Sequence, residues 1–178
     1  EQFNEIKDGA MHILSWLAYG DYGLTENDIS ELLQLTFPKE DKNKIDKYVR
    51  FFIKYLSDDV ITISDGSVVL TDESFKNFLI EFAQGTDFIY KFTNWLVNKI
   101  NNNKEISKRY FDLYVQSFLR IQYKGEYLEK TFANLKYLYK HAKTCGLSHL
   151  IKTFRKLIEK FYNIEKPTVV KSEMDIFN

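Results

Sequence analysis

Apolar and polar positions alternate at helical spacing through the first third of the chain. Apolar side chains recur every three or four residues in the stretches 6–17, 29–33 and 45–56. This spacing puts them on one face of a helix, so the pattern predicts three helices. Gly20 is placed to end the first, and Thr25 with Asp28 three residues later indicates a capping arrangement at the start of the second.

The period changes from 3.6 to about 2 after residue 59. The runs 60–63 and 67–70 are rich in β-branched residues and are joined through Asp65-Gly66, which is a strong hairpin signal. A fourth helix follows, with its cap near Thr71 or Asp72 and its end at Gly85. Three short helices, a hairpin and a further helix is the element order of a winged helix domain.

Beyond Gly85 the pattern predicts helices only, over 88–100, 106–123, 127–143 and 149–162, separated by short turn segments. We find no clean internal repeat. The fold class is therefore mainly α. We expect a winged helix domain (1–85), an antiparallel helical array (86–163) and a C-terminal arm or disordered tail (164–178).

Composition narrows the class of protein. Hydrophobic residues make up 44% of the chain, and seven Gly and two Pro among 178 residues favour helices over a sandwich or a disordered chain. Because Cys145 is the single cysteine, we expect neither an internal disulfide framework nor any Cys-based zinc site, which indicates a reducing, cytoplasmic setting. No apolar run approaches the roughly 20 residues of a membrane span, so no membrane is expected.

Charge is balanced overall but divided along the chain. Residues 1–85 carry 8 Lys or Arg and 16 Asp or Glu, whereas residues 86–178 carry 17 and 9. An uneven distribution of charge between two parts of a chain is informative about what each part binds. Either the two halves attract each other, or they meet different partners.

No catalytic constellation is evident, and we assign no catalytic residue and no metal. The phosphate-loop, dinucleotide and zinc-protease motifs are absent from the sequence. His141 and His149 lie four residues before and after Cys145, which raises a nucleophile or a metal hypothesis. We set it aside because these residues flank a glycine turn and no nearby carboxylate could orient a ring. His12 is expected to be a core or boundary histidine.

Aromatic residues recur at helical spacing in the later helices, as in Tyr110, Tyr114 and Phe118 or in Phe132, Leu135 and Tyr139. Such stripes could stack nucleobases, but the spacing is more typical of core and interhelical packing. The Lys-rich faces there are interpreted as solvated surface.

Three basic residues, Lys47, Arg50 and Lys54, fall on one face of the predicted third helix. This is the helix that enters the major groove in a DNA-binding winged helix. The acidic first half and a hairpin without Lys or Arg oppose phosphate binding, so nucleic acid is not our expected partner. The alternative function is still a DNA-binding transcription regulator with a helical dimerisation or ligand domain.

Two segments carry a family resemblance, ILSWLAYGDYGLTENDISELL and VRFFIKYLSDDVITISDGSVVLTDESFKNFLIE. Their order and spacing resemble the winged helix domain that follows the nucleotide-binding module in NACHT-type members of the STAND class of signalling ATPases. The later helices are similar, in general character, to the helical region that links such domains to a sensor of repeats.

The resemblance implies a non-catalytic regulatory segment of a signalling or antiviral-defence ATPase, which acts as a conformational switch by domain packing. Asp72 stands where the family has a nucleotide-contacting histidine, although a carboxylate repels phosphate. Ser74 and Phe75 carry over as capping and core positions. The expected partners are neighbouring domains or another protein, with an oligomer possible in the parent.

The chain begins at Glu1 without Met, which suggests a fragment. We expect no cofactor in this chain itself, and ATP or ADP only if a nucleotide-binding module precedes it.

Overall fold

The computed structural model describes residues 8–57, 59–84, 87–120 and 134–165, and their side chains up to residue 160. This part of the chain is mainly helical and has one small antiparallel sheet of two strands. In chain order the elements are α1 (Gly9–Tyr19), α2 (Glu26–Thr36), α3 (Lys42–Leu56), β1 (Ile61–Ser64), β2 (Ser67–Leu70), α4 (Glu73–Ala83), α5 (Asp87–Asn102), α6 (Lys108–Arg120), α8 (Leu135–Cys145) and α9 (Leu147–Glu165).

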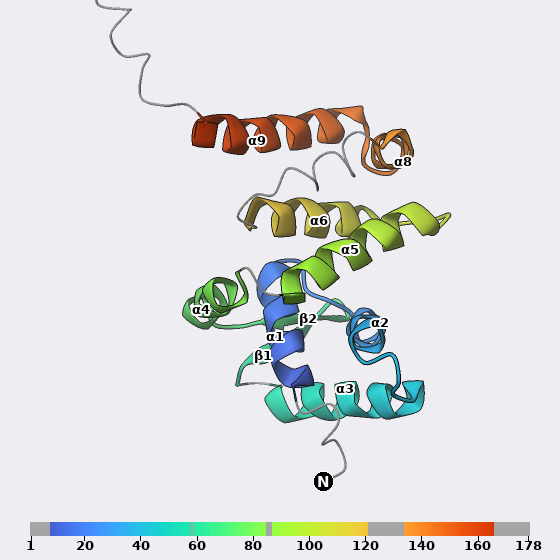
Figure 1. Cartoon of the computed structure of the whole chain (residues 1–178), viewed down its shortest axis with the longest axis vertical. Coiled ribbons are helices and arrows are strands. Elements are labelled where there is room, and N and C mark those ends of the chain that lie inside the picture. Colours follow the sequence, from blue (N-terminus) through green and yellow to red (C-terminus); the bar gives the residue numbers. More distant parts are fainter. Residues whose placement is uncertain (1–7, 58, 85–86, 121–133, 166–178) are drawn as a thin grey trace, which may run out of the picture.

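The elements form a stack with α3 at one end and α8 and α9 at the other (Figure 1). We call α1 to α4 with the hairpin the N-terminal unit, and α5, α6, α8 and α9 the C-terminal helices. Within the N-terminal unit α1 contacts α2, α4 and β2, and it also contacts α5 and α6. The predicted domain boundary at residue 85 lies outside the described residues and stays a prediction.

The local signals in the sequence place most element ends correctly. Thr25 and Asp28 form a reciprocal capping box at the start of α2. Gly20 caps the end of α1, and Asp65 and Gly66 both have positive φ in the hairpin turn, as a two-residue turn of the primed type requires. The hairpin register pairs Ile61 with Leu70.

The cap of the fourth helix is confirmed, and two other details depart from the sequence-based prediction. The cap is Asp72, one of the two predicted positions, and its carboxylate accepts a hydrogen bond from the Phe75 amide at 2.6 Å. Ser74 lies inside the helix, after this cap, so its predicted capping role is wrong. The helix ends at Ala83 with Gln84 as its cap, and Gly85, the predicted end, lies outside the described residues.

The later helices also differ in part from prediction. The described part of the segment predicted as 127–143 is α8, which begins at Leu135, where the Asn134 side chain caps the Lys136 and Tyr137 amides. Tyr114 and Phe118 are buried as expected, but Leu135 and Tyr139 are 81% and 67% exposed, so their predicted packing role is wrong. Phe132 and residues 121–133 as a whole lie outside the described residues.

The end of α9 extends past the predicted limit of the helical array. The helix runs to Glu165 and so includes the first two residues of the predicted tail. Residues 166–178 lie outside the described part. None of the helices described combines the length and the apolar character that a membrane crossing requires.

One hydrophobic core runs through both parts of the molecule. Trp16 of α1, Phe92 of α5, Phe111 of α6 and Tyr137 of α8 are all fully buried in it. Polar contacts reinforce the packing, since the Trp16 indole donates to the Phe88 carbonyl at 3.0 Å. The N-terminal unit and the C-terminal helices are therefore packed together through apolar side chains as well as through polar ones.

The fourth helix offers a matched test of this packing. Leu79 is fully buried on α4, whereas the adjacent Phe78 is 57% exposed, and Phe75 is partly buried against the core. We expect Leu79→Ala to lower the free energy of unfolding by about 2–5 kcal/mol, because it leaves a cavity. We expect Phe78→Ala to cost less than about 1 kcal/mol. Urea unfolding measures both, and equal losses would contradict this placement of α4.

Candidate functional site

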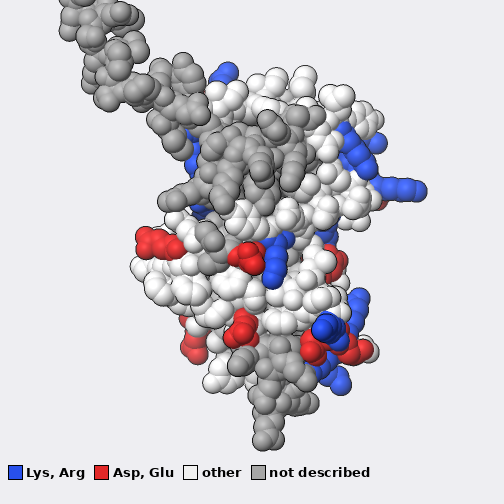
Figure 2. Space-filling view, in the orientation of Figure 1, with Lys and Arg blue, Asp and Glu red and all other residues white. Residues whose placement is uncertain are grey.

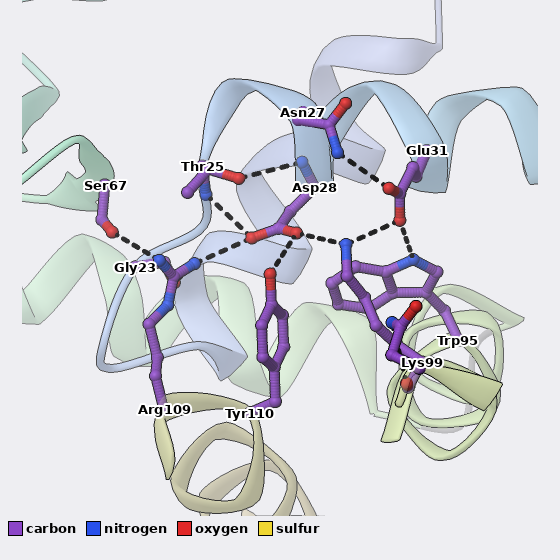
Figure 3. Close-up of polar contacts among 11 residues, drawn as sticks. Gly23, Thr25, Asn27, Asp28, Glu31, Ser67, Trp95, Lys99, Arg109 and Tyr110 are labelled. Carbon is purple, nitrogen blue, oxygen red and sulfur yellow. Dashed lines mark hydrogen bonds and ion pairs between the residues drawn. The ribbon is translucent and has the colours of Figure 1, made fainter. Parts of the chain in front are cut away.

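A buried carboxylate, Asp28, lies where the N-terminal unit meets the C-terminal helices (Figure 3). Its side chain is 1% exposed and accepts four hydrogen bonds. The donors are the Thr25 amide at 3.1 Å, Lys99 Nζ at 2.7 Å, Arg109 Nη2 at 2.8 Å and the Tyr110 hydroxyl at 2.9 Å. All four lone-pair positions of the carboxylate are thus used.

Local structure fixes each participant. The capping box holds Asp28 in the first turn of α2, where a negative charge is favoured by the helix dipole. Lys99 comes from the last turn of α5, and Arg109 and Tyr110 are neighbours in the first turn of α6. One side chain of the N-terminal unit therefore binds two helices of the C-terminal part.

Lys99 extends the cluster along α2. Its ammonium group also contacts Glu31 Oε2 at 2.8 Å, and the same oxygen accepts from the Trp95 indole at 3.1 Å. The ammonium lies 4.9 Å from the Trp95 ring centre and 5.1 Å from that of Tyr110, within the range of cation–π attraction.

Arg109 extends the cluster to the hairpin. Its guanidinium donates to Ser67 Oγ at 2.9 Å and to the Gly23 carbonyl at 3.2 Å. Gly23 has a φ of +69°, and a Cβ there would lie 2.7 Å from the Val68 carbonyl oxygen, so this turn requires glycine. We call Asp28, Glu31, Trp95, Lys99, Arg109 and Tyr110 the Asp28 hub.

A second ion pair joins the same two parts. Arg120, at the end of α6, contacts both oxygens of Asp21 at 2.6 and 2.5 Å and donates to the Ala18 carbonyl at 2.8 Å. Asp21 also pairs with Lys76 of α4. The end of α1 is therefore held to α6 by charge as well as by the core.

These contacts decide between the two interpretations of the charge asymmetry. Asp21, Asp28 and Glu31 belong to the acidic first half, and Lys99, Arg109 and Arg120 belong to the basic second half. The halves do attract each other. On the face shown in Figure 2 most of the acidic side chains lie over the N-terminal elements, where basic ones accompany them, and the described part near α8 and α9 carries mainly basic ones.

The pKa values follow from this arrangement. Burial alone would raise the pKa of Asp28, but the hydrogen bond and charge of Lys99 and the bonds from Thr25 outweigh burial, so this pKa lies below its ordinary value. Burial opposes the charge of Lys99, yet its bonds to Asp28 and Glu31 raise the pKa of this amine. Both groups are therefore charged at neutral pH.

The basic residues predicted for DNA binding lie away from the Asp28 hub. Lys47, Arg50 and Lys54 are all exposed on α3, and this confirms that they share a solvent-facing surface. Arg50 Nε lies 2.8 Å from Glu26 Oε1 of α2, so the guanidinium already forms an ion pair with an acidic neighbour. Asp72 is exposed, and its carboxylate is engaged in capping α4.

The group formed by His141, Cys145 and His149 has a carboxylate beside it, which the sequence did not reveal. His149 Nε2 lies 3.0 Å from Asp112 Oδ1 of α6, so the expectation that no carboxylate could orient a ring is wrong. His141 Nε2 lies 2.9 Å from His149 Nδ1. Burial raises the pKa of Cys145 to about 11, which favours a thiol over a nucleophilic thiolate. His12 is buried, as predicted.

Sequence reasoning assigned Asp28 only a capping role and Tyr110 only a packing role. It did not identify Lys99, Arg109 or Arg120, because each is separated from its carboxylate by more than 65 residues. The one available signal was the opposite charge of the two halves. Comparisons with protein-family models, with curated proteins and with solved structures found no match to this chain.

Neutralising Asp28 should lower the free energy of unfolding more than neutralising Glu26, because Asp28 belongs to buried ion pairs and Glu26 to an exposed one. We expect Asp28→Asn to lower the free energy of unfolding by about 3–5 kcal/mol, because Lys99 and Arg109 lose a buried counter-charge. Glu26→Gln, on the same helix, breaks only the exposed pair with Arg50 and should cost less than about 1 kcal/mol. Denaturant unfolding compares them, and similar costs would contradict a structural role of the hub.

Acid should weaken the same contact. The pKa of Asp28 is lower in the folded than in the unfolded chain, so its stabilisation is present above the unfolded value of about 3.9 and is lost as pH falls through the folded value. We therefore expect the stability difference between the wild type and Asp28→Asn to shrink below about pH 5. Thermal unfolding from pH 7 to pH 2.5 measures it, and a constant difference would contradict the depressed pKa.

Proposed function

We propose that this chain is a winged helix and helical segment of a STAND-type signalling or antiviral-defence ATPase, and that it acts as a conformational switch by domain packing. The segment itself is non-catalytic, and its partner is a neighbouring domain or another protein. The element order of the N-terminal unit and the resemblance of its sequence support the assignment.

The Asp28 hub is the observation that carries the proposal. A switch of this kind needs a segment that moves as one body, because a ligand at one end can shift the other end only through a stiff connection. The hub joins α2 and β2 to α5 and α6, and the core continues across the same boundary. The N-terminal unit can thus transmit a movement of the C-terminal helices.

Two exposed aromatic pairs are candidate contacts for the neighbouring domain. Phe51 and Tyr55 of α3 are 55% and 74% exposed and stack at 5.9 Å between ring centres. Phe78 and Phe82 of α4 are also exposed and stack at 6.4 Å. Exposed aromatic side chains are enriched at interaction sites. We refer to these two pairs together as the α3–α4 aromatic surface.

The position of Asp72 accords with a packing role. It begins α4, the helix that carries Phe78 and Phe82, and its carboxylate accepts from the Phe75 amide. Asp72 therefore fixes the start of this helix, and we propose that it makes no direct contact with phosphate, because a carboxylate repels phosphate. In this chain the switch would depend on protein contacts at α4 more than on a direct contact with nucleotide.

The first test is the sequence of the parent gene on both sides of this segment. We expect a GxxxxGK[ST] loop after a strand upstream and helical repeats downstream. In that parent, Phe78→Glu should weaken the resting arrangement and raise oligomerisation without ligand, as measured by light scattering. Tyr139→Glu, an exposed aromatic position on α8, is the matched control. A gene without the loop, or equal effects of the two variants, would contradict the proposal.

The DNA-binding alternative has a separate test. We expect the chain to show no salt-dependent affinity for duplex DNA of the kind that phosphate contacts produce. The reason is that Glu26 pairs with Arg50 and that the unit around α3 is acidic. Fluorescence anisotropy at 50 and 200 mM salt measures it. Binding that falls with salt and is abolished in Lys47→Glu would favour a transcription regulator instead.

A further inference from the structure

Three residues with metal-binding side chains meet at the junction of α8 and α9, far from the α3–α4 aromatic surface. They are His141 and Cys145 of α8 and His149 of α9, and one ligand atom from each lies within 4.8 Å of the others. His141 Nε2 and His149 Nδ1 are 2.9 Å apart. The three donor atoms therefore converge on one point.

The backbone explains why they converge. His141 and Cys145 are four residues apart, so they lie on the same side of α8, one turn from each other. Gly146 then ends this helix with a φ of +86°, a left-handed conformation that favours glycine. The chain reverses at once into α9, and His149 in its first turn comes back beside the other two.

Aromatic packing holds the His141 ring in place. His141 is fully buried, with its ring centre 4.6 Å from that of Phe111 and 5.6 Å from that of Tyr137. Cys145 and His149 are partly exposed, so an ion can reach the group from solvent. Of the three donors, one is thus fixed by aromatic packing and two lie at the surface.

Asp112 of α6 adds an independent observation that points to a metal. Its Oδ1 lies 3.0 Å from His149 Nε2. When Nε2 carries the proton and donates it to this carboxylate, Nδ1 is left with a lone pair that faces His141 Nε2. A carboxylate behind a histidine in this way is the usual partner of a metal-bound imidazole, because it sets the tautomer and the ring orientation.

We propose that this group is a zinc site, in which His141 Nε2, Cys145 Sγ and His149 Nδ1 bind one Zn²⁺ and water completes a tetrahedral shell. The Cys145 thiol releases its proton to solvent when the ion binds, and the resulting thiolate and two imidazole nitrogens form a mixed donor set that suits this ion. Zinc–nitrogen bonds of about 2.0–2.1 Å place two nitrogens about 3.3 Å apart, so the histidines need to separate by only a few tenths of an ångström.

The site would fasten the α8–α9 corner to α6. Its ligands come from two helices, and the carboxylate that orients one ligand comes from a third. Since the unfolded chain does not hold these ligands together, the free energy of metal binding adds to the stability of the folded chain. This inference is independent of the proposed function and concerns the opposite end of the molecule.

Cobalt titration of the full chain, prepared without a histidine tag, tests the proposal. Co²⁺ replaces Zn²⁺ in such sites and gives a sulfur-to-metal charge-transfer band together with visible bands of tetrahedral form. We expect one Co²⁺ per chain, a charge-transfer band, and displacement of cobalt by one equivalent of Zn²⁺. Cys145→Ser should abolish the charge-transfer band. No saturable binding, or a band that persists in Cys145→Ser, would overturn the proposal.

If Cys145→Ser folds poorly, two further measurements still test the site: the zinc affinity of other variants and the rate of Cys145 alkylation in the wild type. Asp112→Asn should weaken zinc affinity by about 10–100-fold with the stoichiometry unchanged, whereas Glu105→Gln, an exposed position before α6, should leave it unaltered. In the wild type, stoichiometric Zn²⁺ should slow alkylation of Cys145, the single thiol in the chain. Equal affinities of the two variants, or alkylation at an unchanged rate, would contradict the site.

Discussion

The carboxylate of Asp28 is the interaction on which the arrangement of the two parts depends. A charge that is 1% exposed is stable only when every lone pair has a donor, and here the donors come from α2, α5 and α6. Their geometry fixes where the two later helices can lie. Arg109 carries the same constraint to β2 through Ser67, so one buried charge orders helices and hairpin together.

Polar and apolar contacts have different roles across this boundary. The continuous core, with Trp16 and Phe92 fully buried, supplies most of the burial that holds the parts together. The hydrophobic effect is non-directional, whereas hydrogen bonds from four defined donors to a carboxylate are directional. We infer that the hub specifies one relative orientation, which is the property that a segment working by domain packing requires. In the proposed switch, the α3–α4 aromatic surface would present that orientation to a partner.

The sequence predicted what is encoded locally and missed what is encoded at a distance. The capping box of Thr25 and Asp28, the Asp65–Gly66 turn and the α1 end at Gly20 depend on residues within a few positions, and all are confirmed. The contacts of Asp28 with Lys99 and Arg109, and of His149 with Asp112, depend on tertiary packing, which periodicity does not specify. The opposite net charges of the two halves were the only signal in the sequence for the contacts of Asp28 with Lys99 and Arg109.

The most direct measurement is native-state hydrogen exchange on the wild type and on Asp28→Asn. If the hub joins the two parts into one unit, the slowest amides of α2, α5 and α6 open with one common free energy in the wild type. In the variant this free energy should fall by the same amount in all three helices. A loss of protection confined to α2, with α5 and α6 unchanged, would show that the parts open separately and would contradict the central role of Asp28.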